Sequence, residues 1–220
     1  MSEVRLVRFS PVERAFHLLY LVAFLALSFT GAALYFAPFR PYAAGDAGTL
    51  GRLIHRIAAI VLVAGPVLYV LFDRRSLGTS LRWILRWGRD DWAWFRAAQR
   101  VYWRGERRVM PPQGKYNTGQ KLSVWIQMAC FVAFVVTGAV MWFWAASVSA
   151  GVFRLAVIVH DAAFVVAFGF FLLHLYLVLF HPFTRHHVNS MVDGTIAEPD
   201  ARELYPRWHD EVTGAAGRGR

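Results

Sequence analysis

The sequence predicts an all-α integral membrane protein built around a bundle of four transmembrane helices. Apolar residues make up 57% of its 220 residues and charged residues only 17%, a balance typical of membrane proteins. Four apolar segments are each long enough to cross the roughly 30 Å of hydrocarbon in a bilayer. These segments comprise residues 16–36, 54–72, 122–144 and 152–180.

The basic residues are distributed unevenly between the segments that connect these helices. Of 24 Lys and Arg residues, three precede the first helix, twelve lie between the second and the third, and five follow the fourth, which leaves four for the opposite side. Basic residues concentrate in cytoplasmic loops, so both termini and the long loop between the second and third helices are expected in the cytoplasm. The net charge of +10 therefore indicates membrane topology and not a nucleic-acid partner.

The first two predicted helices cross the membrane in opposite directions. Residues 16–36 carry His17 near the cytoplasmic side, and no small-residue cleavage site follows this long apolar run, so we expect an uncleaved anchor and not a signal peptide. Residues 54–72 enter from the outer side, with His55 as their second residue. Pro66 in this helix predicts a kink.

The loop between the second and third helices, residues 73–115, is rich in tryptophan. Residues 81–108 carry five Trp among several Arg, a mixture typical of headgroup-level helices, where Trp anchors and Arg meets lipid phosphate. We therefore expect one or two short helices along the cytoplasmic surface, with a solvated loop as the alternative. Residues 1–190 are predicted to form the membrane domain and the polar residues 191–220 a cytoplasmic tail.

Two histidines mark the fourth predicted helix. His160 and His174 lie fourteen residues apart in an apolar run. In an α-helix this spacing returns to within roughly 40° of the same face and separates the two residues by about 21 Å along the axis. One helix therefore presents two imidazoles on one side, near opposite faces of the membrane.

The predicted topology pairs these histidines with the two on the first and second helices. His160 shares the outer depth with His55, and His174 shares the inner depth with His17. A neutral imidazole is a good iron ligand, so two bis-histidine haem sites are predicted. The lone Cys130 excludes covalent attachment through a CxxCH motif, which makes both haems b-type. A single histidine near a helix end is more often a hydrogen-bonded residue, but four at matching depths favour ligation.

Glycines and the remaining histidines complete the pattern in the helices. The triplet Thr-Gly-Ala occurs twice, around Gly31 and Gly138, both at the outer-haem depth. There a missing side chain would let a porphyrin edge approach the backbone, although small residues also serve ordinary helix packing. The four other histidines adjoin the end of the last helix or follow it and are expected at the surface, namely His181, His186, His187 and His209.

The segment before the third helix, residues 114–121, contains two amides, two glycines and two lysines. It enters the membrane at the depth of the inner histidine pair, where a lipid-soluble quinone could reach it. A quinone site and a simple polar helix start are both compatible with this composition.

Together these features resemble the gamma subunit of respiratory formate dehydrogenase, a di-haem cytochrome b. The resemblance covers roughly residues 8–208. It rests on the four histidines, on the late Tyr205-Pro206-Arg207-Trp208, and above all on the run Lys115-Tyr116-Asn117-Thr118-Gly119-Gln120-Lys121. The histidine pattern alone is shared with the cytochrome b subunits of nickel-iron hydrogenases and with related reductases.

The resemblance implies a ligand set and a set of partners. Two haems b would be ligated by His17, His55, His160 and His174, and quinone would be bound by Asn117, Gly119, Gln120 and His174. The partners implied are an iron–sulfur beta subunit and a molybdenum- or tungsten-containing catalytic alpha subunit. Electrons would pass from the outer-face iron–sulfur subunit to quinone. The alternatives are a hydrogenase cytochrome b, a stand-alone b561-like reductase, and a transporter that uses histidines as a proton relay.

Overall fold

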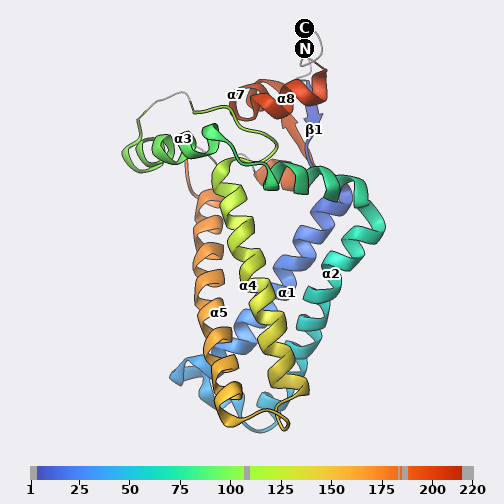
Figure 1. Ribbon diagram of the computed structural model, residues 1–220, viewed down its shortest axis with the longest axis vertical. Coiled ribbons are helices and arrows are strands. Elements are labelled where there is room, and N and C mark those ends of the chain that lie inside the picture. The colour runs from blue at the N-terminus through green and yellow to red at the C-terminus, as the bar shows by residue number, and fades with distance from the viewer. Residues whose placement is uncertain (1–3, 107–109, 183, 185–187, 215–220) are drawn as a thin grey trace. The chain divides into compact units, whose positions relative to one another are not determined.

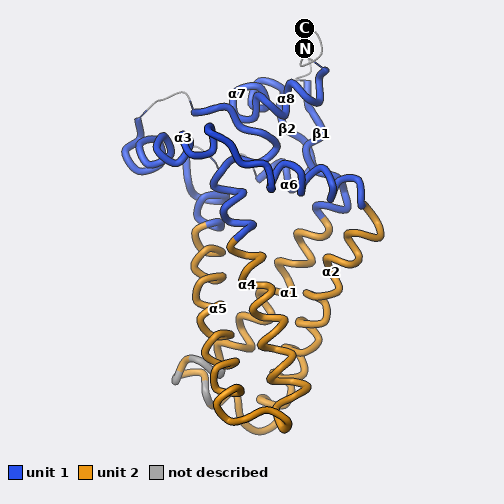
Figure 2. Tube along the Cα trace, viewed as in Figure 1, with its two compact units in different colours: residues 1–14, 74–125, 174–220 blue, residues 15–73, 126–173 orange. Residues whose placement is uncertain are grey.

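The computed structural model describes residues 4–106, 110–182, 184 and 188–214. The chain is mostly helical and divides into two compact units (Figure 2). Unit 1 comprises residues 1–14, 74–125 and 174–220, and unit 2 comprises residues 15–73 and 126–173.

Four long helices carry the apolar segments (Figure 1). Each contains a window that is long and apolar enough to cross a membrane, which confirms the four predicted helices. Each helix begins before its apolar run because the flanking residues continue the helical hydrogen bonding. The second helix also continues past its run, whereas the other three end one residue before the predicted limit. The four helices are α1 (Pro11–Tyr35), α2 (Gly45–Leu85), α4 (Thr118–Phe143) and α5 (Ala150–Leu179), and the 3-10 helix η1 (Ala37–Ala43) follows α1.

Helix α2 changes direction at Asp73. The backbone of Asp73 has φ −149° and ψ 58°, which are not helical angles. The expected kink at Pro66 is therefore not the place where the chain leaves the helical conformation. The break coincides with the end of the apolar run, where Arg74 and Arg75 follow.

Unit 2 is held together by aromatic and small side chains from its helical segments. Ala163 and Ala167 lie four residues apart on one face of α5, where their small size lets neighbouring side chains approach. They form a buried cluster with Phe24 of α1 and Cys130 of α4. Helix α2 joins through Tyr69, whose ring stacks on that of Phe16 at a centroid distance of 4.9 Å.

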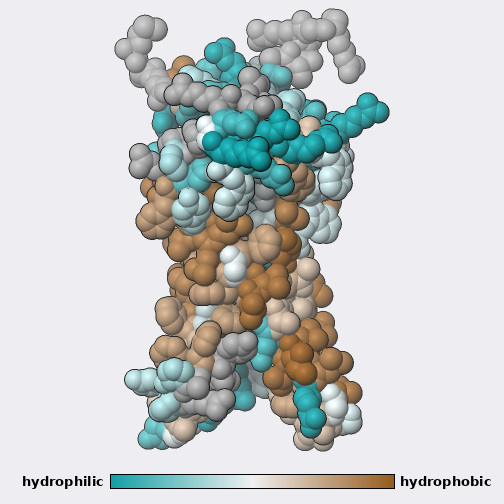
Figure 3. Space-filling view, turned by 90° about the vertical axis from the view of Figure 1, so that its left-hand side faces the viewer, coloured by the Kyte–Doolittle hydropathy of each residue, from teal (hydrophilic) through white to brown (hydrophobic). Residues whose placement is uncertain are grey.

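The outward faces of these segments carry large apolar side chains. Phe29, Leu71 and Phe72 are each more than 70% exposed, and Figure 3 shows hydrophobic residues in brown over much of the helical surface. In water such exposure would be costly, but a lipid environment accepts it. This surface is consistent with a multi-pass membrane protein.

Unit 1 contains a small sheet and several short helices that the all-α prediction did not include in full. Strand β1 (Arg5–Val7) pairs antiparallel with β2 (Thr195–Ala197). The short helices are α3 (Arg89–Ala98), the π-helix η2 (Gln99–Trp103), α6 (Asn189–Val192), α7 (Glu198–Leu204) and α8 (Pro206–Thr213). The helices expected among residues 81–108 are therefore present as the end of α2, α3 and η2.

The core of unit 1 joins both ends of the chain. Tyr205 and Trp208 are almost fully buried and pack with Trp83, Ile196 and Ala201. The guanidinium of Arg8 lies 3.9 Å from the centroid of the Tyr205 ring. The residues that we expected to form a polar tail thus contribute strand, helix and core.

Two tryptophans and two histidines are placed differently from the sequence-based expectation. Trp83 and Trp94 are buried within unit 1, whereas Trp92 and Trp103 are exposed, so only part of the tryptophan set is free to meet headgroups. The prediction of a surface position is wrong for His181 and His209, which are both buried. His181 contacts the rings of Tyr102 and Tyr176, and His209 faces Glu198 and Asp210. His186 and His187 lie outside the described residues.

Candidate functional site

His55 of α2 and His160 of α5 face each other inside unit 2. Their ring centroids are 6.5 Å apart and their planes are inclined by 46°. A metal–imidazole bond is about 2 Å long, so two imidazoles that share one metal ion have centroids roughly 6 Å apart. The structure therefore brings together the two histidines that were paired by depth, at a separation that suits one shared metal ion.

The ligand set at this place suits haem better than a bare ion. Among the described residues, no group of three or more His, Cys, Asp or Glu side chains could hold a metal ion. Two imidazoles are too few for a typical bare-ion site. They are a complete axial set for haem iron, because the porphyrin supplies the other four nitrogens.

Two threonines hold the imidazoles from the neighbouring helices. Thr30 Oγ1 of α1 lies 2.8 Å from His55 Nδ1, and Thr137 Oγ1 of α4 lies 2.8 Å from His160 Nδ1. Each hydroxyl also donates a hydrogen bond to the carbonyl oxygen four residues earlier, at 2.7 Å for Thr30 and 2.6 Å for Thr137. Sequence reasoning noticed the two Thr-Gly-Ala triplets but considered only their glycines, so it missed these contacts.

The glycines of the same triplets lie beside the imidazoles. A Cβ added to Gly31 would lie 3.8 Å from His55 Cε1, and one added to Gly138 would lie 3.9 Å from His160 Cε1. Apart from these atoms and the adjoining residues of the glycine's own helix, nothing among the described residues comes within 4 Å of either position. Close helix packing would place a neighbouring backbone there, so the contacts favour space beside the imidazoles over small-residue packing.

The second predicted pair spans the two units. His17 lies on α1 in unit 2, and His174 lies on α5 in unit 1, fourteen residues after His160. The structure shows both on membrane-spanning helices, as expected from the sequence. Their pairing remains a prediction.

The predicted quinone residues Asn117 and Gln120 cap helix α4. The backbone N–H of Asn117 donates to Gln120 Oε1 at 3.0 Å, and the backbone N–H of Gln120 donates to Asn117 Oδ1 at 2.9 Å. This reciprocal arrangement is a capping box. It uses the side-chain oxygens, whereas within the described chain the two amide nitrogens donate no hydrogen bond, so both remain available as donors.

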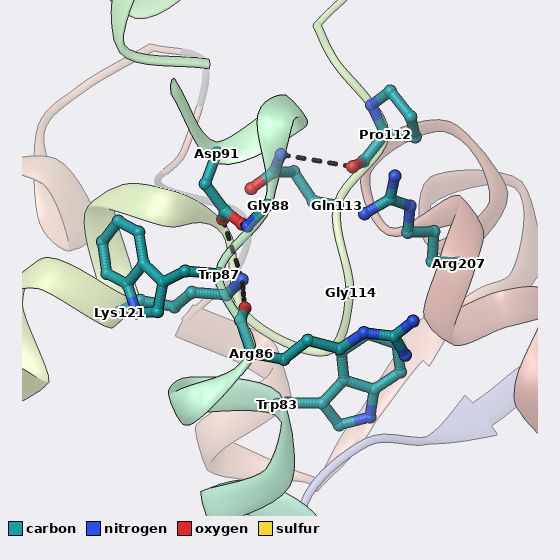
Figure 4. Close-up of a pocket in the computed structure, with 10 residues that line it drawn as sticks. All are labelled: Trp83, Arg86, Trp87, Gly88, Asp91, Pro112, Gln113, Gly114, Lys121 and Arg207. Carbon is teal, nitrogen blue, oxygen red and sulfur yellow. Dashed lines mark hydrogen bonds and ion pairs between the residues drawn. The ribbon is translucent and has the colours of Figure 1, made fainter. Parts of the chain in front are cut away.

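The two lysines of the same run are buried in ion pairs. Lys115 Nζ lies 2.6 Å from Glu13 Oε1 at the start of α1, and Lys121 Nζ lies 2.8 Å from Asp91 Oδ1 of α3. Figure 4 shows Lys121 between the Asp91 carboxylate and the backbone carbonyl of Arg86, a hydrogen bond of 2.8 Å. Each ammonium group binds acceptors from other elements of unit 1, so both help to hold this unit together.

The remaining members of the run also make structural contacts. Tyr116 donates to Ser80 Oγ at 2.9 Å, and Ser80 in turn donates to Glu13. The Trp94 indole leaves little room for a side chain at Gly119, because an added Cβ would lie 2.8 Å from its Cη2 atom. The run therefore joins α1, α2 and α3 to the start of α4.

Known proteins of similar sequence also indicate a haem protein. A family model described as prokaryotic cytochrome b561 matches residues 8–194. Among curated relatives, the cytochrome b556(Fdn) subunit of the nitrate-inducible formate dehydrogenase of Escherichia coli K12 is 24% identical over 218 residues, which is 97% of this chain and 94% of the relative.

Two further relatives carry similar names. The formate dehydrogenase cytochrome b556 subunit of Haemophilus influenzae is 25% identical over 96% of this chain and 84% of its own length. The cytochrome b556(fdo) subunit of formate dehydrogenase from Escherichia coli K12 is 26% identical over 94% of this chain and 93% of its own length. The resemblance seen in the sequence is thereby confirmed.

Proposed function

Because the chain belongs to the prokaryotic cytochrome b561 family, we propose that it is the membrane-anchoring di-haem cytochrome b subunit of a respiratory formate dehydrogenase. In this role it carries electrons from an iron–sulfur subunit at the outer face of a bacterial inner membrane to quinone near the inner face. The observation that carries the proposal is the opposition of His55 and His160 at 6.5 Å, with a threonine on each ring.

The four histidines have defined tasks in this proposal. His55 and His160 hold the outer haem b, and His17 and His174 hold the inner one. Haem b supplies reversible one-electron transfer at the iron. These histidines would supply both protein ligands of each haem, which favours electron carriage over substrate binding. Phe134 of unit 2 packs against the His160 ring at a centroid distance of 5.0 Å.

Quinone is the proposed electron acceptor. The side-chain amide nitrogens of Asn117 and Gln120 are donors that the capping box leaves available, and a quinone carbonyl is an acceptor. The second ring nitrogen of His174 is a further donor in this proposal, since a metal ligand uses only one nitrogen. The Trp94 ring occupies the place of a side chain at Gly119, so the proposed contact of Gly119 with quinone would be made by its backbone.

Partners and orientation follow from charge and from the relatives. The relatives are named as subunits of formate dehydrogenases, so the proposed partners are the iron–sulfur beta subunit and the molybdenum- or tungsten-containing alpha subunit. The excess of Lys and Arg supports a cytoplasmic position for the termini and for residues 73–115. An alkaline phosphatase fused after Arg220 is expected to be inactive, and activity of that fusion would reverse the proposed orientation.

The direct test is the haem content of the purified chain. A pyridine haemochrome assay is expected to give two haems b per wild-type chain and one after His55→Ala or His160→Ala. His17→Ala or His174→Ala is expected to remove the other haem. His209→Ala, which changes a buried histidine outside both sites, serves as the control and should retain two. One haem per wild-type chain would contradict the proposal.

A second candidate is supported by the breadth of the family model, which is described as cytochrome b561 and not as formate dehydrogenase. The chain could then serve a nickel-iron hydrogenase or act as a stand-alone reductase. Purification in mild detergent separates these functions. Co-purification of an iron–sulfur protein and a formate-oxidising subunit supports the first, whereas a hydrogenase or an active chain without partners supports the second.

A further inference from the structure

We propose that Thr30 and Thr137 are positioning residues, which fix the protonated nitrogen and the orientation of His55 and His160 so that Nε2 of each ring is the nitrogen that binds iron. The inference rests on the proposed function, because it states how the outer haem site is built. It concerns two residues that the sequence analysis did not assign to the site.

The protons of the hydrogen bonds around Thr30 can be assigned. A threonine hydroxyl has one proton, and Thr30 Oγ1 lies 2.7 Å from the carbonyl oxygen of Ala26, which can only accept. If the hydroxyl proton pointed to His55 instead, two oxygens would face each other at 2.7 Å without a proton between them. The hydroxyl therefore donates to Ala26 and accepts from the Nδ1–H of His55, 2.8 Å away.

The second half of the site has the same arrangement of donors and acceptors. Thr137 Oγ1 lies 2.6 Å from the carbonyl oxygen of Ala133 and 2.8 Å from His160 Nδ1. Both rings thus carry their proton on Nδ1, which leaves the lone pair on Nε2. The arrangement occurs independently on two helix pairs, α1 with α2 and α4 with α5, which a chance contact would not produce.

The hydrogen bond also affects the metal. A histidine ligand whose second nitrogen donates a hydrogen bond is a stronger electron donor to the metal and is fixed in orientation. Removal of the acceptor makes the imidazole a weaker donor, which destabilises ferric relative to ferrous iron. Loss of either threonine hydroxyl is therefore expected to raise the midpoint potential of the outer haem and to leave that of the inner haem unchanged.

The test uses Thr30→Val and Thr137→Val, which keep the side-chain shape but lack the hydroxyl, together with Thr30→Ser and Thr137→Ser, which retain it. Optical redox titration and electron paramagnetic resonance of the oxidised chain are the readouts. In each Val variant one of the two haem potentials is expected to rise, and the g values of one low-spin ferric haem to shift. The Ser variants should match the wild type.

A control for hydroxyl loss is Ser28→Ala, since Ser28 is buried on the same helix as Thr30 and its hydroxyl forms no hydrogen bond with either histidine in the described structure. It should leave both potentials unchanged. Loss of the outer haem in a Val variant but not in the matching Ser variant also supports the proposal. Wild-type potentials and g values in both Val variants would overturn it, as would Ser variants that behave like Val. Fewer than two haems in the wild-type chain contradicts the proposed function instead.

Discussion

Units 1 and 2 pair their inward polar side chains in opposite ways. In unit 2 the polar contacts at the candidate site are between neutral groups, with a threonine hydroxyl on each imidazole. Unit 1 instead buries two full ion pairs, Glu13 with Lys115 and Asp91 with Lys121. Neutral imidazoles cost little to desolvate and keep a lone pair for a metal, whereas buried charges are stable only with every partner in place.

The most distinctive sequence motif and the best-formed site lie in different units. The run from Lys115 to Lys121 identified the resemblance, yet most of its side chains are used to join the helices of unit 1. The histidines and threonines of unit 2 lie in less distinctive apolar sequence but make the geometry that suits haem. A motif can therefore mark a family through the scaffold that it builds.

The largest effect is expected from breaking an ion pair of unit 1. Lys115→Met leaves the Glu13 carboxylate buried without its ammonium partner, which costs about 3–5 kcal/mol. The temperature at which unit 1 becomes sensitive to limited proteolysis in detergent should fall accordingly. The exposed pair Arg82–Glu211 provides the control, since Arg82→Met should cost only about 0–1 kcal/mol. Equal effects at both sites would show that the buried charges do not hold unit 1 together.

Alkaline pH is expected to weaken unit 1 through Tyr116. An unfolded tyrosine ionises near pH 10, but burial raises the pKa of Tyr116 to about 12. The folded state therefore keeps a proton that the unfolded state loses. The contribution of Tyr116 to the free energy of unfolding is fully present below pH 10. It falls by at most about 1.4 kcal/mol per pH unit as the pH rises through 10–12.

Tyr116→Phe tests this dependence, because it removes the titrating group together with the bond to Ser80. The variant should be less stable at neutral pH but should lose less stability than the wild type between pH 10 and 12 in the same proteolysis assay. Tyr42→Phe changes an exposed tyrosine and should leave the pH dependence unaltered. Parallel curves for Tyr116→Phe and the wild type would assign the alkaline loss to other groups.

The fold was predictable where it depends on local sequence and not where it depends on long-range contacts. Apolar runs located the four helices, and the fourteen-residue interval between His160 and His174 led to the pairing of His160 with His55. The core of unit 1 was not predicted because it joins distant parts of the chain, as in the contact of Arg8 with Tyr205. No local pattern signals such a contact, so Trp83 read as a lipid anchor and the C-terminal residues as a tail.

The candidate site was predictable to a similar degree. Depth matching selected the histidines, but the threonines required three-dimensional information, since Thr30 is 25 residues from His55. The repeated Thr-Gly-Ala triplet was the available signal. In the other unit, Asn117 and Gln120 were recognised as polar groups, while their mutual capping could be suspected only from their spacing.

Glycine substitutions are expected to act differently in the two units. Gly119→Ala in unit 1 places a Cβ 2.8 Å from the Trp94 ring, and such overpacking costs about 1–3 kcal/mol. Gly31→Ala in unit 2 makes only an ordinary contact of 3.8 Å with His55, so the protein itself should tolerate it. Thermal unfolding of the two variants measures this contrast, and equal destabilisation would contradict it.

A larger side chain at Gly31 tests whether the space beside His55 is needed for haem binding. Gly31→Leu fills the space beside the His55 imidazole and should reduce the haem content from two to one per chain in the pyridine haemochrome assay. Gly169→Leu is the matched control, because a Cβ at Gly169 on α5 meets nothing within 4 Å in the described structure. Retention of two haems in Gly31→Leu would show that Gly31 serves ordinary helix packing and not haem binding.

The smallest structural effect is expected at the start of α4, where capping and quinone binding can be separated by chemistry. Replacing Asn117 or Gln120 with Ala removes half of the capping box and costs about 0.5–2 kcal/mol, so slow quinone reduction in such a variant would be ambiguous. Asn117→Asp and Gln120→Glu keep the oxygens that accept from the backbone, and an acidic group is favourable at a helix start. Both variants lack the amide nitrogen that could donate to a quinone. Stability and haem content should therefore match the wild type, while reduced haems should reoxidise more slowly when quinone is added. If these two variants reoxidise at the wild-type rate while the Ala variants are destabilised, Asn117 and Gln120 serve only to cap the helix. Quinone must then bind elsewhere.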